Sequence, residues 1–320
     1  MAAASSDVSS LTQRVVGEIE RAVVGKRLLL EQIVAAVLAG GHVLLEDYPG
    51  LAKTLIASSF ADTLGLDFKR IQFTPDLLPG DITGGYVYDR AENRFELHKG
   101  PLFANIILAD EINRASPKTQ SALLEAMQER QVTLEGETLR LPEPFVVVAT
   151  QNPIEYEGTF PLPEAQLDRF LIKLSVGYPS PDEEQEILQR RRERRQDAFD
   201  LQQVTEAGEL LAMRLAVEEV HVHPDIERYI VALITATRQR RQVAVGASPR
   251  GSLALLKLSR AWAAMHGRLF VLPDDVKAFV QPALVHRLIL EPDLWMQRYA
   301  ADEILADILQ TVPVPVMVGD

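Results

Sequence analysis

Cysteine is missing from the 320-residue chain, which excludes disulfides and thiolate metal ligands. Positive charge is also short, with 33 Lys and Arg against 45 Asp and Glu, so the net charge is −12. Proteins that hold long phosphate backbones need basic surface, so this balance argues against nucleic acid as a partner. No run of about 18 apolar residues occurs, and we expect no membrane span. The start of the chain lacks the features of a signal peptide, and together with the missing cysteines this fits a cytoplasmic protein.

The residues that are present have the balance of a globular protein, 47% hydrophobic and 24% charged. Five apolar segments alternate with helical patterns, which predicts an α/β fold with a parallel five-stranded sheet. These segments are "HVLLE", "FKRIQF", "ANIILAD", "PFVVVATQN" and "RFLIKLSVGYP". We expect a flexible leader over residues 1–10, a nucleotide-binding domain over 11–178, and a linker with an all-helical lid domain over 179–320.

The stretch "LLEDYPGLAKTL" (44–55) resembles a phosphate-binding loop in which Asp47 and Ala52 stand at the two usual glycine positions. Gly50 allows the backbone to approach a phosphate, Lys53 would reach the terminal phosphates, and Thr54 would ligate Mg²⁺. A carboxylate about 6 Å from a phosphate costs about 3 kcal/mol at an effective dielectric near 20. If the loop binds nucleotide, the Asp47 side chain must therefore point outward or pair with a cation. The loop alone fits an ordinary strand–turn–helix equally well.

Two more polar sites follow buried strands. "IILADE" places Asp110 and Glu111 at a strand end, where a phosphate-loop enzyme needs one carboxylate near Mg²⁺ and another to orient water. "VVVATQN" ends in Asn152, which can hold the attacking water or the γ-phosphate. Alternatively, Asp110 and Glu111 are two acids at a solvated strand end, and Asn152 is part of a simple turn.

Longer blocks make the pattern specific. The run "LADEINRASPKTQSALLEAMQERQVTLEG", with "EAQLDRF" and "GASPRGS" after it, resembles the MoxR family of AAA+ ATPases. The resemblance covers about residues 12–310, and both loop glycines commonly vary in that family. It implies an AAA+ core with a helical lid, and ATP and Mg²⁺ as cofactors. It also implies a nucleotide-binding set, which in this chain is Val24, Gly25, Pro49, Gly50, Leu51, Ala52, Lys53, Thr54 and Leu55.

The same resemblance implies roles for the remaining residues. Thr54 and Asp110 would hold Mg²⁺, and Glu111 would be the catalytic base. Asn152 matches sensor 1, Arg169 the arginine finger that reaches a neighbouring subunit, and Arg250 the sensor 2 residue of the lid. Segments 80–100 and 131–142 match hairpin-like inserts that face a pore or a partner.

The function implied is ATP hydrolysis at the interfaces of a homo-oligomeric ring, a hexamer, that remodels or matures partner proteins, including metal insertion. Proteins with a von Willebrand factor A domain are the partner class that the resemblance implies. Asp47 and Ala52 motivate an alternative, a nucleotide-gated binding platform with little or no hydrolysis. A motor subunit like that of magnesium chelatase is a further alternative, and a DNA-dependent motor is disfavoured by the acidic charge.

Overall fold

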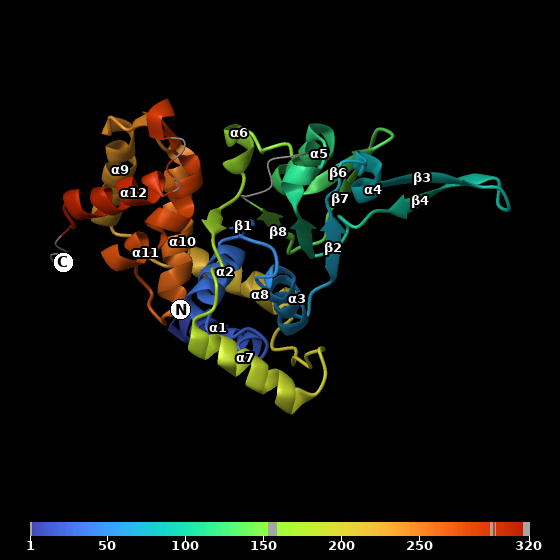
Figure 1. The fold of residues 1–320 in the computed structure, drawn as a ribbon, viewed down its shortest axis with the longest axis horizontal. Helices are drawn as coiled ribbons and strands as arrows, with labels where there is room; N and C mark the ends of the chain where they lie inside the picture. Colours follow the sequence, from blue (N-terminus) through green and yellow to red (C-terminus); the bar gives the residue numbers. More distant parts are fainter. Residues whose placement is uncertain (1, 153–158, 295–296, 298, 316–320) are drawn as a thin grey trace.

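The chain folds into an α/β core with a group of helices beside it and one long hairpin that projects from the core (Figure 1). The computed structural model describes residues 2–152, 159–294, 297 and 299–315, with side chains from residue 7 onward. The segment "PIEYEG" (153–158) lies outside the described residues. Within the described part of the chain, no helix has both the length and the apolar character needed to cross a bilayer.

The central sheet has five parallel strands in the order β2-β5-β8-β1-β9. They are β1 (Val43–Glu46), β2 (Phe68–Gln72), β5 (Ile106–Asp110), β8 (Val146–Gln151) and β9 (Ile172–Leu174). Each lies in a segment predicted to be a strand, so the predicted fold class is confirmed. Because the strands are parallel, the carboxyl ends of β1, β2, β5 and β8 lie at one end of the sheet and their amino ends at the opposite end.

Both faces of the sheet are buried, as unbroken apolar strands predict. Successive side chains of a strand point to opposite faces. Ile106 and Leu108 of β5 therefore join one core, with α1 (Ala2–Ile19), α2 (Arg27–Leu38) and α3 (Lys53–Leu64). Ile107 and Ala109 join a second core on the other face, with α5 (Pro117–Glu129). The Ser116 hydroxyl accepts a hydrogen bond from the Thr119 N–H and caps α5.

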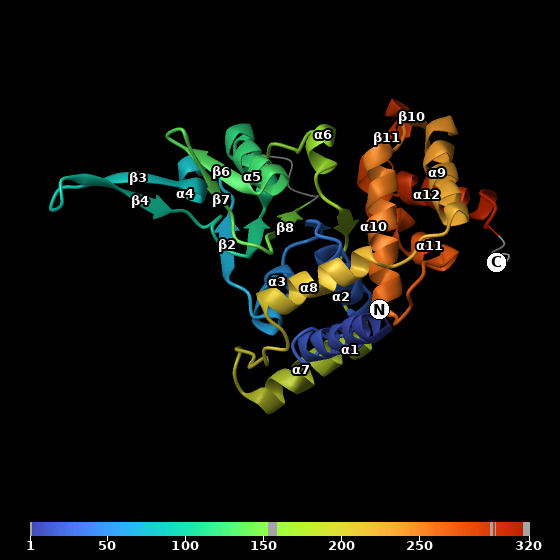
Figure 2. The ribbon, with the colours of Figure 1, turned by 180° about the vertical axis from the view of Figure 1, so that it is seen from behind.

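The second half of the chain is mainly helical and lies beside the sheet (Figure 2). Its elements are α8 (Ala207–Glu218), α9 (Pro224–Gln239), β10 (Val243–Val245), α10 (Pro249–Met265), α11 (Pro273–Leu284), η2 (Val285–Arg287), β11 (Ile289–Leu290), η3 (Pro292–Leu294) and α12 (Ala300–Thr311). α8 packs against α1 and α2, so part of the segment assigned to the linker and lid covers the nucleotide-binding core.

Two hairpins interrupt the core where inserts were expected. β3 (Gly84–Asp89) pairs with β4 (Arg94–Lys99) after the short helix α4 (Pro79–Thr83), and β6 (Gln131–Leu134) pairs with β7 (Glu137–Arg140). The β3–β4 hairpin reaches far beyond the sheet (Figure 1). Short connections complete the core, namely η1 (Ile112–Arg114) after β5 and α6 (Glu164–Leu167) before β9.

Helix α1 begins at Ala2, inside the segment 1–10 for which a flexible leader is expected. The residues "SSDVSS" are small and polar, which suggested a leader. Val8, however, is spaced with Leu11 and Val15 as one apolar stripe of a helix, and all three are buried in the core.

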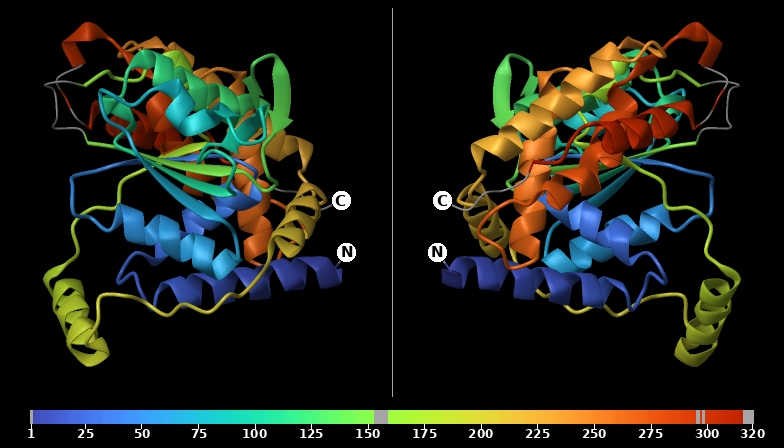
Figure 3. Two further views of the ribbon diagram at one scale, coloured as in Figure 1. Left: turned by 90° about the vertical axis from the view of Figure 1, so that its right-hand side faces the viewer. Right: turned by 90° about the vertical axis from the view of Figure 1, so that its left-hand side faces the viewer.

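Helix α7 (Pro181–Arg194) begins at the predicted domain boundary and stands off the rest of the molecule (Figure 3). None of its residues, all of which the structure describes, is buried. It contains most of the basic run "QRRRERRQD", which therefore lies on a solvated helix.

Candidate active site

The loop after β1 forms an anion-binding cradle. Gly50 and Ala52 both have positive φ, 83° and 54°, and α3 begins directly after Ala52. In the described structure no side chain caps this helix N-terminus, so its N–H groups and favourable dipole face the loop. An alanine in the left-handed region is strained by about 1–2 kcal/mol relative to the right-handed one, which explains why glycine is usual at this position.

The Asp47 carboxylate points away from this cradle. Its side chain is buried, with a residue exposure of 3%. One carboxylate oxygen accepts hydrogen bonds from Ser175 Oγ at 2.8 Å and from the Gly177 N–H at 2.6 Å, and the other accepts from the Tyr48 N–H at 2.8 Å. The Lys53 ammonium donates to the Asp47 carbonyl oxygen at 2.7 Å. Asp47 therefore ties the loop to the segment after β9, and does not lie among the residues that line the adjacent pocket.

Burial alone would raise the pKa of Asp47. The hydrogen bonds from Gly177, Ser175 and Tyr48 and the charge of Lys53 outweigh that effect, so the pKa lies below its ordinary value. The carboxylate is thus ionised at neutral pH.

We expect Asp47→Asn to lower the free energy of unfolding by about 1.5–3 kcal/mol, because hydrogen bonds to a charged group are lost. Since the folded pKa is depressed, Asp47 stabilises the fold above the unfolded pKa of about 3.9, and this contribution disappears as the pH falls through the folded value. Urea unfolding of the variant and the parent at pH 7 and at about pH 3, below the unfolded pKa, measures both effects. Asp62→Asn, at an exposed position on α3, is the control. An equal difference at both pH values would contradict this assignment.

Two carboxylates lie at the end of β5. Asp110 accepts a hydrogen bond from Thr150 Oγ1 at 2.7 Å, and Arg70 Nε and Nη2 donate to its other oxygen at 3.1 and 2.7 Å. Glu111 has a φ of 56° and accepts from Gln72 Nε2 at 2.8 Å and from Arg114 Nη1 at 3.1 Å.

Sequence reasoning missed Arg70, Gln72 and Thr150. The available signal was the polar side chains near the carboxyl ends of two predicted strands. Arg114 pairs with Glu111 in its own chain.

A pocket of about 460 Å³ lies where the loop and these strand ends meet. The structure brings together the loop, both carboxylates and Asn152. The lining residues are Pro49, Gly50, Leu51, Ala52, Lys53, Thr54, Leu55, Arg70, Gln72, Asp110, Glu111 and Asn152.

Val24 and Gly25 do not line this pocket. A Cβ at Gly25, where φ is +70°, would lie 1.8 Å from Glu183 Oε1 at the start of α7. The neighbouring Tyr178 ring stacks on Tyr48 of the loop, with centroids 6.0 Å apart. The turn at Val24 and Gly25 therefore lies close to the segment after β9 that Asp47 also contacts.

Arg169 and Arg250 lie in a second pocket, of about 280 Å³. The Asp168 carboxylate pairs with Arg287 Nε at 2.7 Å and with Arg250 Nη1 at 3.5 Å. Other lining residues, Gly40 to His42 and Leu171, come directly before β1 and β9. This second pocket is therefore at the amino ends of the strands, whereas Lys53 is at their carboxyl ends.

The length of β1 separates the two pockets. Four strand residues span about 13 Å. The two sets of lining residues have no member in common. In this conformation a single chain does not bring Arg169 or Arg250 to its own phosphate-binding loop.

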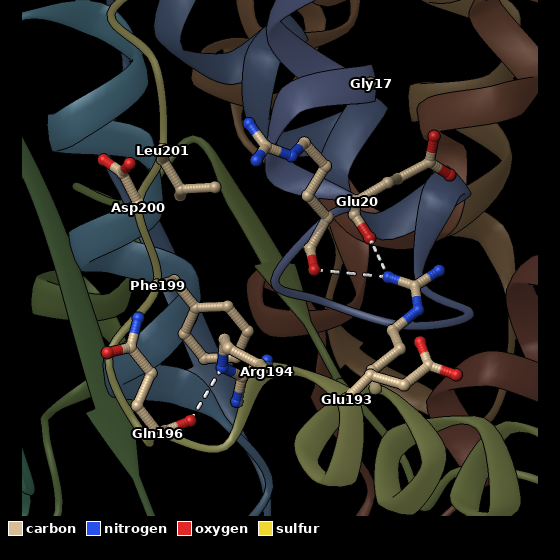
Figure 4. Close-up of a pocket in the computed structure, with 10 residues that line it drawn as sticks. Gly17, Glu20, Glu193, Arg194, Gln196, Phe199, Asp200 and Leu201 are labelled. Carbon is tan, nitrogen blue, oxygen red and sulfur yellow. Dashed lines mark hydrogen bonds between the residues drawn. The ribbon is translucent and has the colours of Figure 1, made fainter.

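A wider cavity, of about 560 Å³, lies between α1, α7 and the loop at 196–201 (Figure 4). Arg190 Nη1 donates to the carbonyl of Glu20 at 2.6 Å, near the C-terminal end of α1. The Arg194 guanidinium lies 3.8 Å from the centroid of the Phe199 ring. Acidic and basic side chains alternate around this cavity, so no single ligand charge is favoured.

Comparison with known proteins identifies the family. Residues 42–172 match the model of the ATPase family associated with various cellular activities (AAA), and residues 235–308 match an AAA lid domain. The chain is 45% identical to chaperone MoxR1 of Mycobacterium tuberculosis over 95% of this chain and 82% of that protein. The chain belongs to the MoxR family of AAA+ ATPases. It is also 48% identical to the uncharacterised protein YeaC of Bacillus subtilis, over 97% of both chains. A solved structure described as a candidate ATPase from Cytophaga hutchinsonii superposes with a TM-score of 0.90 at 39% identity, over 98% of this chain and 97% of that one.

The pocket beside Lys53 suits the nucleotide that a MoxR-family ATPase requires. The loop supplies backbone N–H groups, a helix N-terminus and an ammonium for phosphates. Thr54 and Asp110, which both line this pocket, carry oxygen atoms of the kind that Mg²⁺ prefers as ligands. Among the described residues there is no cluster of three or more His, Cys, Asp or Glu that could hold a metal ion. Such a site fits Mg²⁺, which is usually bound through one or two carboxylates together with substrate phosphates.

Proposed function

We propose that the chain hydrolyses ATP in a homo-oligomeric ring, a hexamer, whose active sites are each shared between two copies. The observation that carries this proposal is the separation of the two pockets at opposite ends of β1. In a ring, the Arg169 pocket of one copy faces the Lys53 pocket of the next. Each copy then supplies what its neighbour lacks.

Within one shared site the residues have distinct tasks. Gly50 to Thr54 and the N-terminus of α3 hold the phosphates, and Lys53 neutralises their charge. Thr54 and Asp110 would hold Mg²⁺, which neutralises phosphate charge when bound. Val24 and Gly25 contribute to the base end of the nucleotide site.

The other residues of the shared site act on water and on developing charge. Glu111 orients the attacking water and accepts its proton, and Gln72 and Arg114 fix the position of that carboxylate. Asn152 orients the water or the γ-phosphate. Arg169 and Arg250 of the neighbouring copy stabilise charge in the transition state.

The relative named chaperone MoxR1 supports a chaperone-like role, in which turnover remodels or matures a partner protein. A partner with a von Willebrand factor A domain, and metal insertion as one outcome, are included in this proposal. The exposed side chains of Val87, Tyr88 and Phe95 on the projecting hairpin are available for such contacts.

The motivation for a non-hydrolysing platform is weakened by the structure, because Asp47 points away from the phosphates and Ala52 adopts the required left-handed conformation. ATP turnover per subunit, measured against protein concentration, tests the proposal. We expect it to rise and then level off as rings assemble, with Lys53→Ala as the blank. Turnover per subunit that is the same at all concentrations, down to those at which the chain is a monomer, would contradict a shared site.

A further inference from the structure

The finger-bearing segment is held from the lid side by one buried arginine. Arg287 lies in η2, directly after α11, and its side chain is only 4% exposed. Its Nε donates to Asp168 Oδ1 at 2.7 Å, and Nη2 donates to the Phe170 carbonyl at 2.8 Å. Nη1 donates to the Leu171 carbonyl at 3.2 Å and also to the carbonyl of Ala283 in α11.

A second residue of η2 contacts the same segment. His286 Nε2 lies 3.1 Å from the Phe170 carbonyl, and because a carbonyl oxygen only accepts, this nitrogen carries the proton. Phe170 is itself fully buried in the second core, on the face of the sheet that α5 covers. The residues on both sides of Arg169 are thus fixed by side chains from the lid.

A buried guanidinium is weak evidence for stability, because burial of the ion offsets much of what its ion pair contributes. The number and direction of its bonds are more informative. Arg287 uses its rigid fork of donors on Asp168, Phe170 and Leu171, three residues that immediately surround the finger. A lysine has no such fork and could reach only part of this set.

We infer that Arg287 is a positioning residue for the arginine finger: it holds the 168–171 segment so that Arg169 is presented to the neighbouring copy. This inference rests on the proposed shared site. It implies that η2 and the finger segment move as one body, so that a shift of the lid in one copy shifts Arg169 in the active site of the next.

Subunit mixing separates this role from a general effect on folding. Arg287→Ala alone should turn over ATP about 10²-fold more slowly, as expected for a misplaced catalytic group, with unchanged ATP affinity. Its own Lys53 pocket remains intact. Mixing it with Lys53→Ala, which has an intact finger, should therefore restore turnover well above that of either variant alone.

A control variant, a conservative variant and a reference mixture complete the experiment. Arg240→Ala removes a lid arginine that pairs with Asp307 and Thr311 within the lid, and it should keep parental turnover. Arg287→Lys keeps the charge, and its ATP turnover should lie between that of Arg287→Ala and that of the parent. If Arg287→Ala does not fold, Arg287→Lys replaces it in the mixture. The mixture of Arg169→Ala with Lys53→Ala is the reference for the shared site itself.

The inference is overturned if Arg287→Ala keeps parental turnover. It is also overturned if the mixture containing an Arg287 variant stays inactive while the reference mixture recovers, because the defect would then lie outside the finger. If the reference mixture also stays inactive, the shared site fails, and the positioning role fails with it.

Discussion

Glu111→Gln is expected to reduce ATP turnover by about 10²–10⁴-fold while leaving ATP binding intact. The amide cannot accept the proton of the attacking water. It can still accept the hydrogen bonds from Gln72 and Arg114, because both go to a single carboxylate oxygen. The change therefore removes the base with little disturbance of the site.

Steady-state turnover and equilibrium binding of labelled ATP measure the two effects separately. Glu227→Gln, at an exposed position on α9 of the lid, is the matched control and should behave as the parent does. Turnover of Glu111→Gln within a few-fold of the parent would show that another group acts as the base.

Arg169→Ala is expected to reduce turnover by about 10³–10⁵-fold, the range measured for arginine fingers that act across an interface. ATP affinity should change little, because Arg169 is not in the pocket that contains Lys53 of its own chain. Arg169→Lys should also be impaired, since a lysine does not reproduce the planar fork of donors.

The control for Arg169 is Arg228→Ala, which removes an exposed arginine paired with Asp225 on α9. A strong loss of ATP affinity in Arg169→Ala, measured at concentrations at which the chain is a monomer, would contradict the role assigned to it, since that result would place the side chain at the nucleotide of its own chain.

The sequence predicted the fold and the main pocket because both depend on local patterns. The strands β1, β5 and β8 are almost wholly apolar and buried, and in a parallel sheet the polar residues that follow such strands lie at the same end of the sheet. That argument was enough to place Asp110, Glu111 and Asn152 near Lys53, and the structure brings them together in one pocket.

What could not be predicted depends on contacts between distant segments. Gln72 reaches Glu111 only because β2 is the neighbour of β5, and strand order is not encoded in any local pattern. The Asp47 carboxylate bonds to Ser175, 128 residues further along the chain, and this contact depends on β9 lying next to β1. The hydrogen bond from Arg287 to Asp168 likewise joins residues 119 positions apart in the sequence.

The most direct test of the shared site is ATP turnover in an equimolar mixture of Lys53→Ala and Arg169→Ala subunits. Each variant alone lacks one half of every site and should be inactive. In mixed rings, some interfaces combine the intact loop of one variant with the intact finger of the other, so the mixture should recover a clear fraction of parental turnover. A mixture whose members co-assemble, yet which is no more active than the two variants measured apart, would contradict a site shared between copies.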